Sequence, residues 1–427
     1  MRVHVGVVLS AVLELFGTFS FKRKSTEKRS RTKKVKSYVY FYFESFSMQE
    51  EILLLEKELD SLLPRERLIA TSPSEALLET AAKWSDSVWK MAKELGELSF
   101  TKNQMEQALQ FCERPVFICG VHRGGTTLLR DMLDDHPSLS VLPSEGTFIT
   151  NHEHKILALA ANLRCGLLCK LWLQRLAYSI NQPPYWLLGR SSTQSSPYVY
   201  FTRAFITWWN FFANEKENKN DLWPMIVVQL AYAFAQNKFA ENSTVCCWVD
   251  KTPTNERYLA RLWRQFPEAK ILHIIRDPKD VFASRKKSEP FTPPRVFIRD
   301  LRMSFKVAYE QQTKNDSRYL LIKYEDLCSD PSAMGHNVSA FLGIQYLPCL
   351  INPTVAGKPT QANSSFKPNT VHGKILSADE HRHEKLITSK EMQLLSAALH
   401  QNAFKLGYTL PAVNALKAFM LRIINRI

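Results

Sequence analysis

The sequence predicts an α/β fold, in which a parallel sheet is flanked by helices on both faces. Four short apolar runs are typical of buried strands: residues 116–119, 245–249, 271–275 and 319–323. Each run leads through a short loop to a helical pattern: residues 126–135, 255–266, 279–287 and 332–342. Strand, loop and helix repeated at this spacing indicate βαβ units. A 45% share of hydrophobic residues in a chain of 427 is enough for a large core and excludes a mostly disordered protein.

Two further regions have helical patterns. Residues 48–112 combine apolar positions at helical spacing with alternating charges, which predicts an N-terminal helical segment ahead of the main domain at 113–427. Residues 152–240 interrupt the strand–helix series with an aromatic, helix-like insert that contains Trp208 and Phe212. Either these aromatic residues pack a helical subdomain, or the insert forms a lid or acceptor pocket, since open α/β folds bind ligands at the carboxyl ends of their strands.

Positive charge is concentrated at the N-terminus. The chain carries +15, but residues 1–47 hold ten Lys/Arg against three Glu, which leaves +8 for the other 380 residues. This distribution argues against a nucleic-acid-binding domain and leaves only a basic tail as an alternative for nucleic-acid binding.

The apolar stretch at residues 3–21 is marginal for a membrane span and contains Glu14. We therefore expect residues 1–47 to be a disordered extension, a membrane contact made through residues 1–36, or a stretch upstream of a start at Met48. The basic residues that follow the apolar stretch favour the cytoplasm or the cytosolic membrane face, whereas four N-x-S/T sequons are consistent with a Golgi-like lumen.

The eight cysteines predict no metal site. None belongs to the paired C-x-x-C arrangement with His that a zinc site requires. Cys246 and Cys247 lie in an apolar run that we expect to be a strand, whose geometry would point their side chains to opposite faces.

A glycine-rich turn, Gly120 to Thr127, follows the first predicted strand and opens a helix. Such a turn directs backbone N–H groups at an anion, so the sheet is P-loop-like. The Lys of a nucleoside-triphosphate P-loop is replaced by Thr126, and Arg123 is the only nearby cation. ATP or GTP hydrolysis therefore fits poorly, and an ordinary tight turn is the other interpretation.

A second anion site is predicted at the end of the 271–275 strand. Arg276 follows the strand, Asp277 suits a helix N-cap, and Pro278 suits the first helical position. Arg276 and Ser284 together could grip a phosphate by charge-assisted and hydroxyl hydrogen bonds. Two anion sites at one sheet edge imply a ligand with two separated phosphate-like groups.

With these features the sequence resembles the sulfotransferase family that uses 3′-phosphoadenosine-5′-phosphosulfate (PAPS) as donor. The glycine-rich turn is similar to the family's 5′-phosphosulfate loop, and Arg276 with Ser284 to its 3′-phosphate motif. Three further segments match in the same order: residues 250–253, 266–270 and 324–327. The resemblance covers about residues 114–373 and is greatest to the protein-tyrosine sulfotransferase branch and its microbial relatives, which carry Arg in the loop and a Glu after the first helix.

The sequence departs from the family pattern at two places. Gly124 stands where the family usually has Ser, which removes one hydroxyl from the phosphate cradle. The segment 357–366 is similar to an Asn-Ser-Ser segment of microbial members, which implies donor contacts for Ser364 and Ser365. An ordinary Asn/Ser loop is the alternative there.

The resemblance implies a donor site without metal. Thr126 and Thr127, with the N–H groups of Gly124 and Gly125, are expected to hold the 5′-phosphate. The residues assigned to the rest of the donor are Arg123 and Lys251 for the sulfuryl oxygens and departing phosphate, Arg276 and Ser284 for the 3′-phosphate, and Tyr324 for the adenine.

Glu145 is the candidate general base for the acceptor hydroxyl, because it follows the first helix and should return to the same sheet edge. His122 is the second candidate, since imidazole titrates near neutrality. The competing functions are a P-loop nucleotide kinase or NTPase, and a nucleotide-binding relative without turnover. The acceptor class, whether peptide tyrosine, carbohydrate, lipid or small alcohol, and the oligomeric state are left open.

Overall fold

The computed structural model describes residues 47–63, 73–178, 185–215, 220–360, 372–377 and 386–425. The chain divides into two compact units, Met1–Glu51 and Ile52–Ile427. The second unit contains the sheet and every helix from α3 onward. Except for residue 47, the predicted extension at 1–47 lies outside the described residues.

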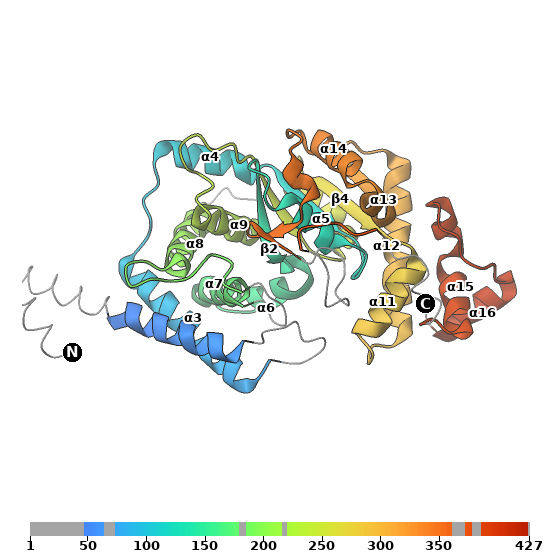
Figure 1. The fold of residues 1–427 in the computed structure, drawn as a ribbon, viewed down its shortest axis with the longest axis horizontal. Coiled ribbons are helices and arrows are strands. Elements are labelled where there is room, and N and C mark those ends of the chain that lie inside the picture. Colours follow the sequence, from blue (N-terminus) through green and yellow to red (C-terminus); the bar gives the residue numbers. More distant parts are fainter. Residues whose placement is uncertain are drawn as a thin grey trace, which may run out of the picture. The chain divides into compact units, whose positions relative to one another are not determined.

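A five-stranded parallel sheet forms the centre of the second unit, in the order β2-β3-β1-β4-β5 (Figure 1). Its strands are β1 (Pro115–Cys119), β2 (Leu139–Glu145), β3 (Cys247–Lys251), β4 (Lys270–Ile275) and β5 (Tyr319–Lys323). The predicted α/β fold is confirmed, and four strands lie where the sequence indicated. The fifth, β2, was not predicted as a strand, because Pro143 interrupts its pattern at a register shift that an edge strand tolerates.

Both faces of the sheet are buried, which explains the continuous apolar character of its strands. On one face Val116 and Ile118 of β1 belong to a hydrophobic cluster with residues of α5 (Thr126–Leu133), α13 (Tyr324–Ser329) and α14 (Pro331–Leu342). Phe117, which alternates with them, instead packs against Trp248, with 5.4 Å between the ring centroids.

A second hydrophobic cluster joins Val121, which follows β1, and Ile275 at the end of β4 to three helices. These helices are α11 (Pro278–Ser288), α12 (Pro294–Lys314) and α15 (Ser389–Lys405), and α16 (Ala415–Asn425) packs on α15. The long helix α12 was not among the predicted helices. The predicted helix at 255–266 is divided into a 3₁₀ turn, Asn255–Tyr258, and α10 (Leu259–Gln265).

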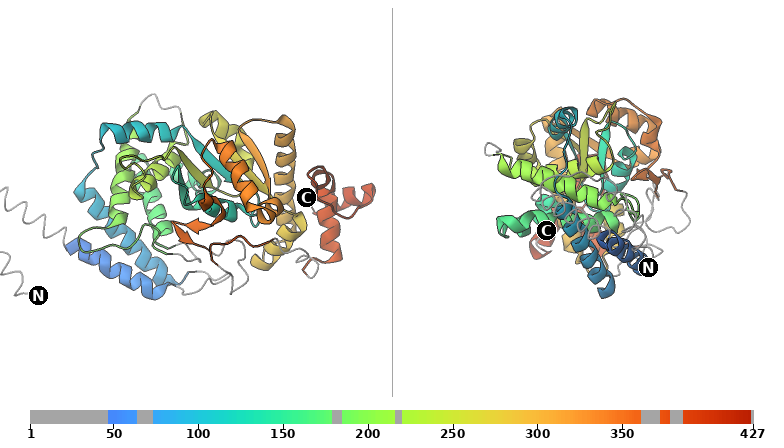
Figure 2. Two further views of the ribbon diagram at one scale, coloured as in Figure 1. Left: turned by 45° about the horizontal axis from the view of Figure 1, so that its top comes forward. Right: turned by 90° about the vertical axis from the view of Figure 1, so that its left-hand side faces the viewer.

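The N-terminal segment and the insert are helical. They comprise α3 (Glu75–Leu95), α4 (Lys102–Cys112), α6 (Glu153–Leu157), α7 (Ala161–Ala177), α8 (Pro197–Asn214) and α9 (Trp223–Ala235). Trp208 is buried and stacks on Phe100 at 5.5 Å, so these aromatic residues pack the insert against the N-terminal segment. Figure 1 shows most of these helices on one side of the labelled strand β2, and α11, α12 and α15 on the other side, beyond the label of β4; Figure 2 gives two further views of the same arrangement.

None of the helices in the described part of the chain is both long and apolar enough to span a bilayer.

The prediction that the side chains of Cys246 and Cys247 point to opposite faces of a strand was wrong. Cys246 precedes β3 rather than lying within it, and its Sγ is 3.4 Å from that of Cys247.

Candidate active site

The carboxyl ends of the parallel strands collect the candidate residues at one edge of the sheet. Each of the five strands ends at, or leads directly into, one of them: Arg123 after β1, Glu145 at the end of β2, Lys251 at the end of β3, Arg276 after β4, and Tyr324 after β5. A parallel sheet places these ends side by side whatever the separation in sequence.

The glycines of the turn after β1 are required by its geometry. Gly120 has φ 140°, and a Cβ there would lie 2.3 Å from the carbonyl oxygen of Ile274 on β4. Gly125 has φ 107°, and its Cβ would lie 2.5 Å from Cδ2 of Tyr324. In the described part of the chain, no side-chain hydrogen bond caps the start of α5 after Gly125, so the backbone N–H groups at this helix start could bind an anion.

The structure gives a steric reason for Gly124. Its N–H donates to the carbonyl oxygen of Val121 at 2.9 Å and closes the turn. A Cβ at Gly124 would lie 2.9 Å from that same oxygen, so a serine would force the turn to shift. Beyond the turn, Thr126 is buried and Thr127 is exposed at the start of α5.

Arg123 connects the turn to α11. Its backbone is in the left-handed region at φ 69°, and its Nε donates to Oγ of Ser288 at 3.2 Å. The Arg123 side chain is therefore directed toward α11, the helix that follows Arg276.

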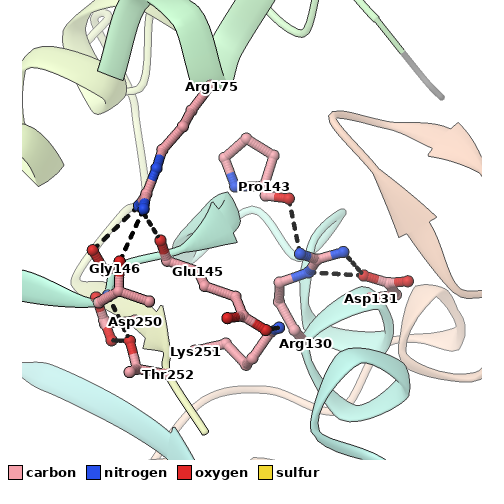
Figure 3. Close-up of polar contacts among 10 residues, drawn as sticks. Arg130, Asp131, Pro143, Glu145, Gly146, Arg175, Asp250, Lys251 and Thr252 are labelled. Atoms are coloured by element: carbon pink, nitrogen blue, oxygen red, sulfur yellow. Dashed lines mark hydrogen bonds and ion pairs between the residues drawn. The ribbon is translucent and has the colours of Figure 1, made fainter. Parts of the chain in front are cut away.

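Glu145 and Lys251 form an ion pair between the ends of β2 and β3. Lys251 Nζ lies 2.7 Å from Glu145 Oε1, and the Lys251 side chain is only 3% exposed (Figure 3). Burial alone would raise the pKa of Glu145, but the charge and hydrogen bond of Lys251, together with the charges of His122 and Arg130, lower it to about 2. Glu145 is thus a carboxylate at any physiological pH.

Two arginines that sequence reasoning missed hold the backbone around Glu145 from opposite sides (Figure 3). Arg130 of α5 donates to the carbonyl oxygen of Pro143 at 2.7 Å. Arg175 of α7 donates to the carbonyl oxygens of Glu145 and Gly146, and to Oγ1 of Thr147 at 2.8 Å. Arg130 could have been suspected from its position in the helix after the turn, whereas nothing in the sequence links Arg175 to Glu145.

The buried carboxylate of Asp250 is hydrogen-bonded, through Thr252, to the backbone that follows β2. Asp250 accepts from Oγ1 of Thr252 at 2.8 Å, and Thr252 Oγ1 accepts from the N–H of Thr147 at 2.9 Å. A Cβ at Gly146 would overlap the Asp250 carboxylate, which explains why a glycine follows the last residue of β2. Burial raises the pKa of Asp250 to about 6, although Thr252, Lys251 and Arg175 stabilise its charged form.

Arg276 occupies a different environment at the β4–β5 end of the edge. Its guanidinium lies 4.3 Å from the centroid of the Tyr324 ring, and it forms a long ion pair with Asp280 at 3.8 Å. The side chain is buried, and its Nε has no hydrogen-bond partner among the described residues. Ser284 is half-buried two turns along α11, whose N-cap is Asp277 and whose first residue is Pro278, as predicted.

Comparison with known proteins identifies the family to which the chain belongs. The sequence profile of the Sulfotransferase family matches residues 115–348, more than half of the chain. The chain belongs to the sulfotransferase family. A comparison with curated protein sequences finds no match.

Solved structures of other sulfotransferases are similar to this sulfotransferase. The sulfotransferase domain of the Synechococcus PCC 7002 olefin synthase is 22% identical, covers 74% of this chain and 94% of its own, and gives a TM-score of 0.39. The sulfotransferase domain of the curacin biosynthetic pathway is 19% identical, with coverages of 69% and 98% and a TM-score of 0.41. STF9 from Mycobacterium avium is 12% identical, with coverages of 81% and 100% and a TM-score of 0.37.

The remaining predicted site residues of the sulfotransferase have different outcomes. Ser364 and Ser365 lie outside the described residues. The His122 residue is exposed, and partial desolvation lowers the pKa of its imidazole although the Glu145 charge acts in the opposite direction. His122 is therefore neutral near pH 7 and stays the second candidate for the base.

One buried group in the described part of the sulfotransferase could hold a metal ion by its composition, namely Cys119, Glu256 and His273. Both ring nitrogens of His273 already have hydrogen-bond partners, Tyr319 at 2.6 Å and Ser304 at 2.9 Å. Glu256 accepts from the N–H of Gly120 at 3.2 Å. The group is thus a hydrogen-bonded support beneath the turn.

Proposed function

We propose that this sulfotransferase moves a sulfuryl group from PAPS to the hydroxyl group of an acceptor. Membership of the sulfotransferase family supports sulfuryl transfer in general. We propose in addition the identity of the donor, of the general base and of the residues that bind the donor. The observation that carries it is that the turn with Lys251 and the buried Arg276 lie along one sheet edge, where they would form two separated anion sites. PAPS has a 5′-phosphosulfate and a 3′-phosphate to match them.

The donor site follows from the chemistry of these groups. The N–H groups of Gly124 and Gly125, with the hydroxyls of Thr126 and Thr127, would bind the 5′-phosphate at the N-terminus of α5. Arg276 would donate its unpaired Nε–H to the 3′-phosphate, with Ser284 as a second donor. The ring of Tyr324, already packed against Gly125 and the Arg276 guanidinium, would contact the adenine.

The reaction requires the pair between Glu145 and Lys251 to rearrange. With pKa about 2, Glu145 is a weak base while Lys251 is bonded to it. When the donor binds, Lys251 and Arg123 would turn toward its anionic oxygens, which frees Glu145 and raises its pKa toward the ordinary value. The acceptor oxygen then bonds to sulfur in line, the bond from sulfur to the 5′-phosphate oxygen breaks, and the acceptor proton passes to Glu145.

The acceptor bears a hydroxyl group, and peptide tyrosine, carbohydrate, lipid and small alcohols are all compatible with the proposal. Because the sequence resembles the protein-tyrosine branch, tyrosine peptides are included among the acceptors to be tested. The helical insert borders Glu145 through Arg175, so we propose that acceptor specificity depends on α7 and its neighbours.

Transfer of radiolabelled sulfate from PAPS to a panel of phenols, alcohols, sugars and tyrosine peptides tests the function. We expect labelled product with at least one acceptor class and none with Lys251→Met. In parallel, 3′-phosphoadenosine 5′-phosphate (PAP) should raise the unfolding temperature, whereas ATP with Mg²⁺ should raise it little. Stabilisation by ATP–Mg²⁺ alone would favour a kinase or NTPase, and PAP binding without transfer to any acceptor would favour a relative without turnover.

A further inference from the structure

The C-terminal helix α16 has an apolar surface that no described residue covers. Its exposed apolar side chains are Leu416 (73%), Phe419 (54%), Met420 (49%), Ile423 (58%) and Ile424 (70%). Soluble proteins leave single apolar residues exposed, but five in an eleven-residue helix form a continuous patch that calls for a partner.

The arrangement of these residues around the helix is ordered. With about 100° per residue, the five lie within an arc of about 140° on one side of the helix. Ala418 and Leu421 lie outside that arc and pack toward α15 and its hydrophobic cluster. One side of α16 therefore packs against the domain, and the exposed apolar arc lies on the opposite side of the helix.

Charges select the kind of partner. Lys417 and Arg422 lie at the two flanks of the apolar arc, and both are exposed. The helix contains no Asp or Glu. Across residues 386–425 the one acidic residue is Glu391, whose carboxylate is paired with Lys286 at 2.9 Å.

We propose that α16 docks the protein on the surface of an anionic lipid bilayer. An apolar arc flanked by cations matches the interface of such a bilayer, where the arc enters the acyl boundary and Lys417 and Arg422 reach the phosphate groups. The helix is too short to span, so it lies in the plane of the membrane. This surface differs from the predicted membrane contact at residues 1–36 and does not depend on the donor chemistry.

Vesicle binding of the full chain tests this proposal, with vesicles of phosphatidylcholine and phosphatidylserine at a ratio of about 7 to 3. We expect Phe419→Gln/Ile423→Gln to weaken partitioning about tenfold or more, because two apolar side chains no longer enter the bilayer. The matched control is Leu54→Gln/Leu163→Gln, which removes two apolar side chains of similar exposure, 65% and 55%, and should leave partitioning unchanged. Equal unfolding temperatures would show that both variants fold.

Two further measurements distinguish the lipid surface from other occupants. Lys417→Gln/Arg422→Gln should reduce binding to the mixed vesicles and leave binding to pure phosphatidylcholine as it was. A photoactivatable phosphatidylserine should label peptides from residues 415–425. The proposal would be overturned if labelling were confined to residues 1–46 and the Phe419→Gln/Ile423→Gln variant partitioned like the wild type. It would also be overturned if, without vesicles, the wild type formed concentration-dependent dimers and this variant did not.

Discussion

The two ends of the sheet's carboxyl edge hold their cations in different ways. At the β2–β3 end, Lys251 is buried against Glu145 at 2.7 Å, and the backbone around Glu145 is fixed by two arginines. At the β4–β5 end, Arg276 is also buried, although less than Lys251; its Nε has no partner among the described residues, and Asp280 lies 3.8 Å away. One end contains a satisfied ion pair, whereas the other holds a cation with an unfilled hydrogen bond.

This difference suggests a division of labour between the two ends. A buried donor without an acceptor costs free energy that a bound anion would recover, so the Arg276 end is suited to binding. While Glu145 and Lys251 are paired, neither has a charge left to bind a ligand. When the pair separates, Glu145 becomes available as a base and Lys251 as a cation, so this end is suited to catalysing the transfer. Substitutions at the two ends should therefore affect different kinetic constants.

The largest effect is expected for Glu145→Gln. Loss of the base should lower kcat by about 100- to 10,000-fold. PAP should bind as tightly as before or more tightly, because Lys251 no longer leaves a carboxylate to meet the ligand. Steady-state rates and calorimetry measure the two quantities, and Glu153→Gln, which alters a carboxylate paired with Arg261, is the control. Near-wild-type turnover of Glu145→Gln would transfer the role of base to His122.

Arg276→Ala should weaken PAP binding by about 10- to 150-fold, the range for hydrogen bonds to a charged group. Adenosine 5′-phosphosulfate, which lacks the 3′-phosphate, should bind the variant and the wild type equally. Calorimetry with both nucleotides provides the comparison. Equal losses for the two nucleotides would mean that Arg276 supports the site as a whole and does not hold the 3′-phosphate.

Arg175→Lys should lower kcat by about 10- to 100-fold and leave PAP binding unchanged. A lysine cannot reproduce the forked contacts to Glu145, Gly146 and Thr147, so the Glu145 carboxylate would lose its alignment. Arg164→Lys is the matched control on the same helix, because Arg164 donates to carbonyls of residues 157 and 159, away from the site. A fall in both variants, or in neither, would contradict the positioning role.

The smallest effect concerns pH. His152 accepts a hydrogen bond from Arg175 at 2.8 Å, and burial together with the Arg175 charge lowers its pKa from 6.5 to about 4. The unfolded chain takes up this proton below pH 6.5 and the folded chain only near pH 4, so the stability that neutral His152 contributes is present above pH 6.5 and is lost as the pH falls to 4. Urea unfolding at pH 7, 5.5 and 4 should show a smaller decline for His152→Gln. If the free energy of unfolding fell equally with pH in the wild type and in His152→Gln, titration of His152 would not contribute to the pH dependence of stability.

The sequence predicted the sheet because four of its strands are buried on both faces and therefore appear as continuous apolar runs. It did not predict β2, where Pro143 interrupts the run, and it made no prediction for the residues that form α12. The positions of Gly120, Gly125, Arg276 and Glu145 followed from one rule, that parallel strands present their carboxyl ends at a common edge.

By itself, then, the sequence determined which residue types meet at the edge of the sheet, because local patterns fix strands, turns and helix starts. Only the tertiary structure decided the electrostatic state of each one. It paired Lys251 with Glu145 and brought Arg175 from the insert to the backbone of Glu145, and among the described residues it gave the Nε of Arg276 no partner. Hydrogen bonds and ion pairs depend on distances between elements far apart in the chain, and those distances are set by packing, which no local pattern records.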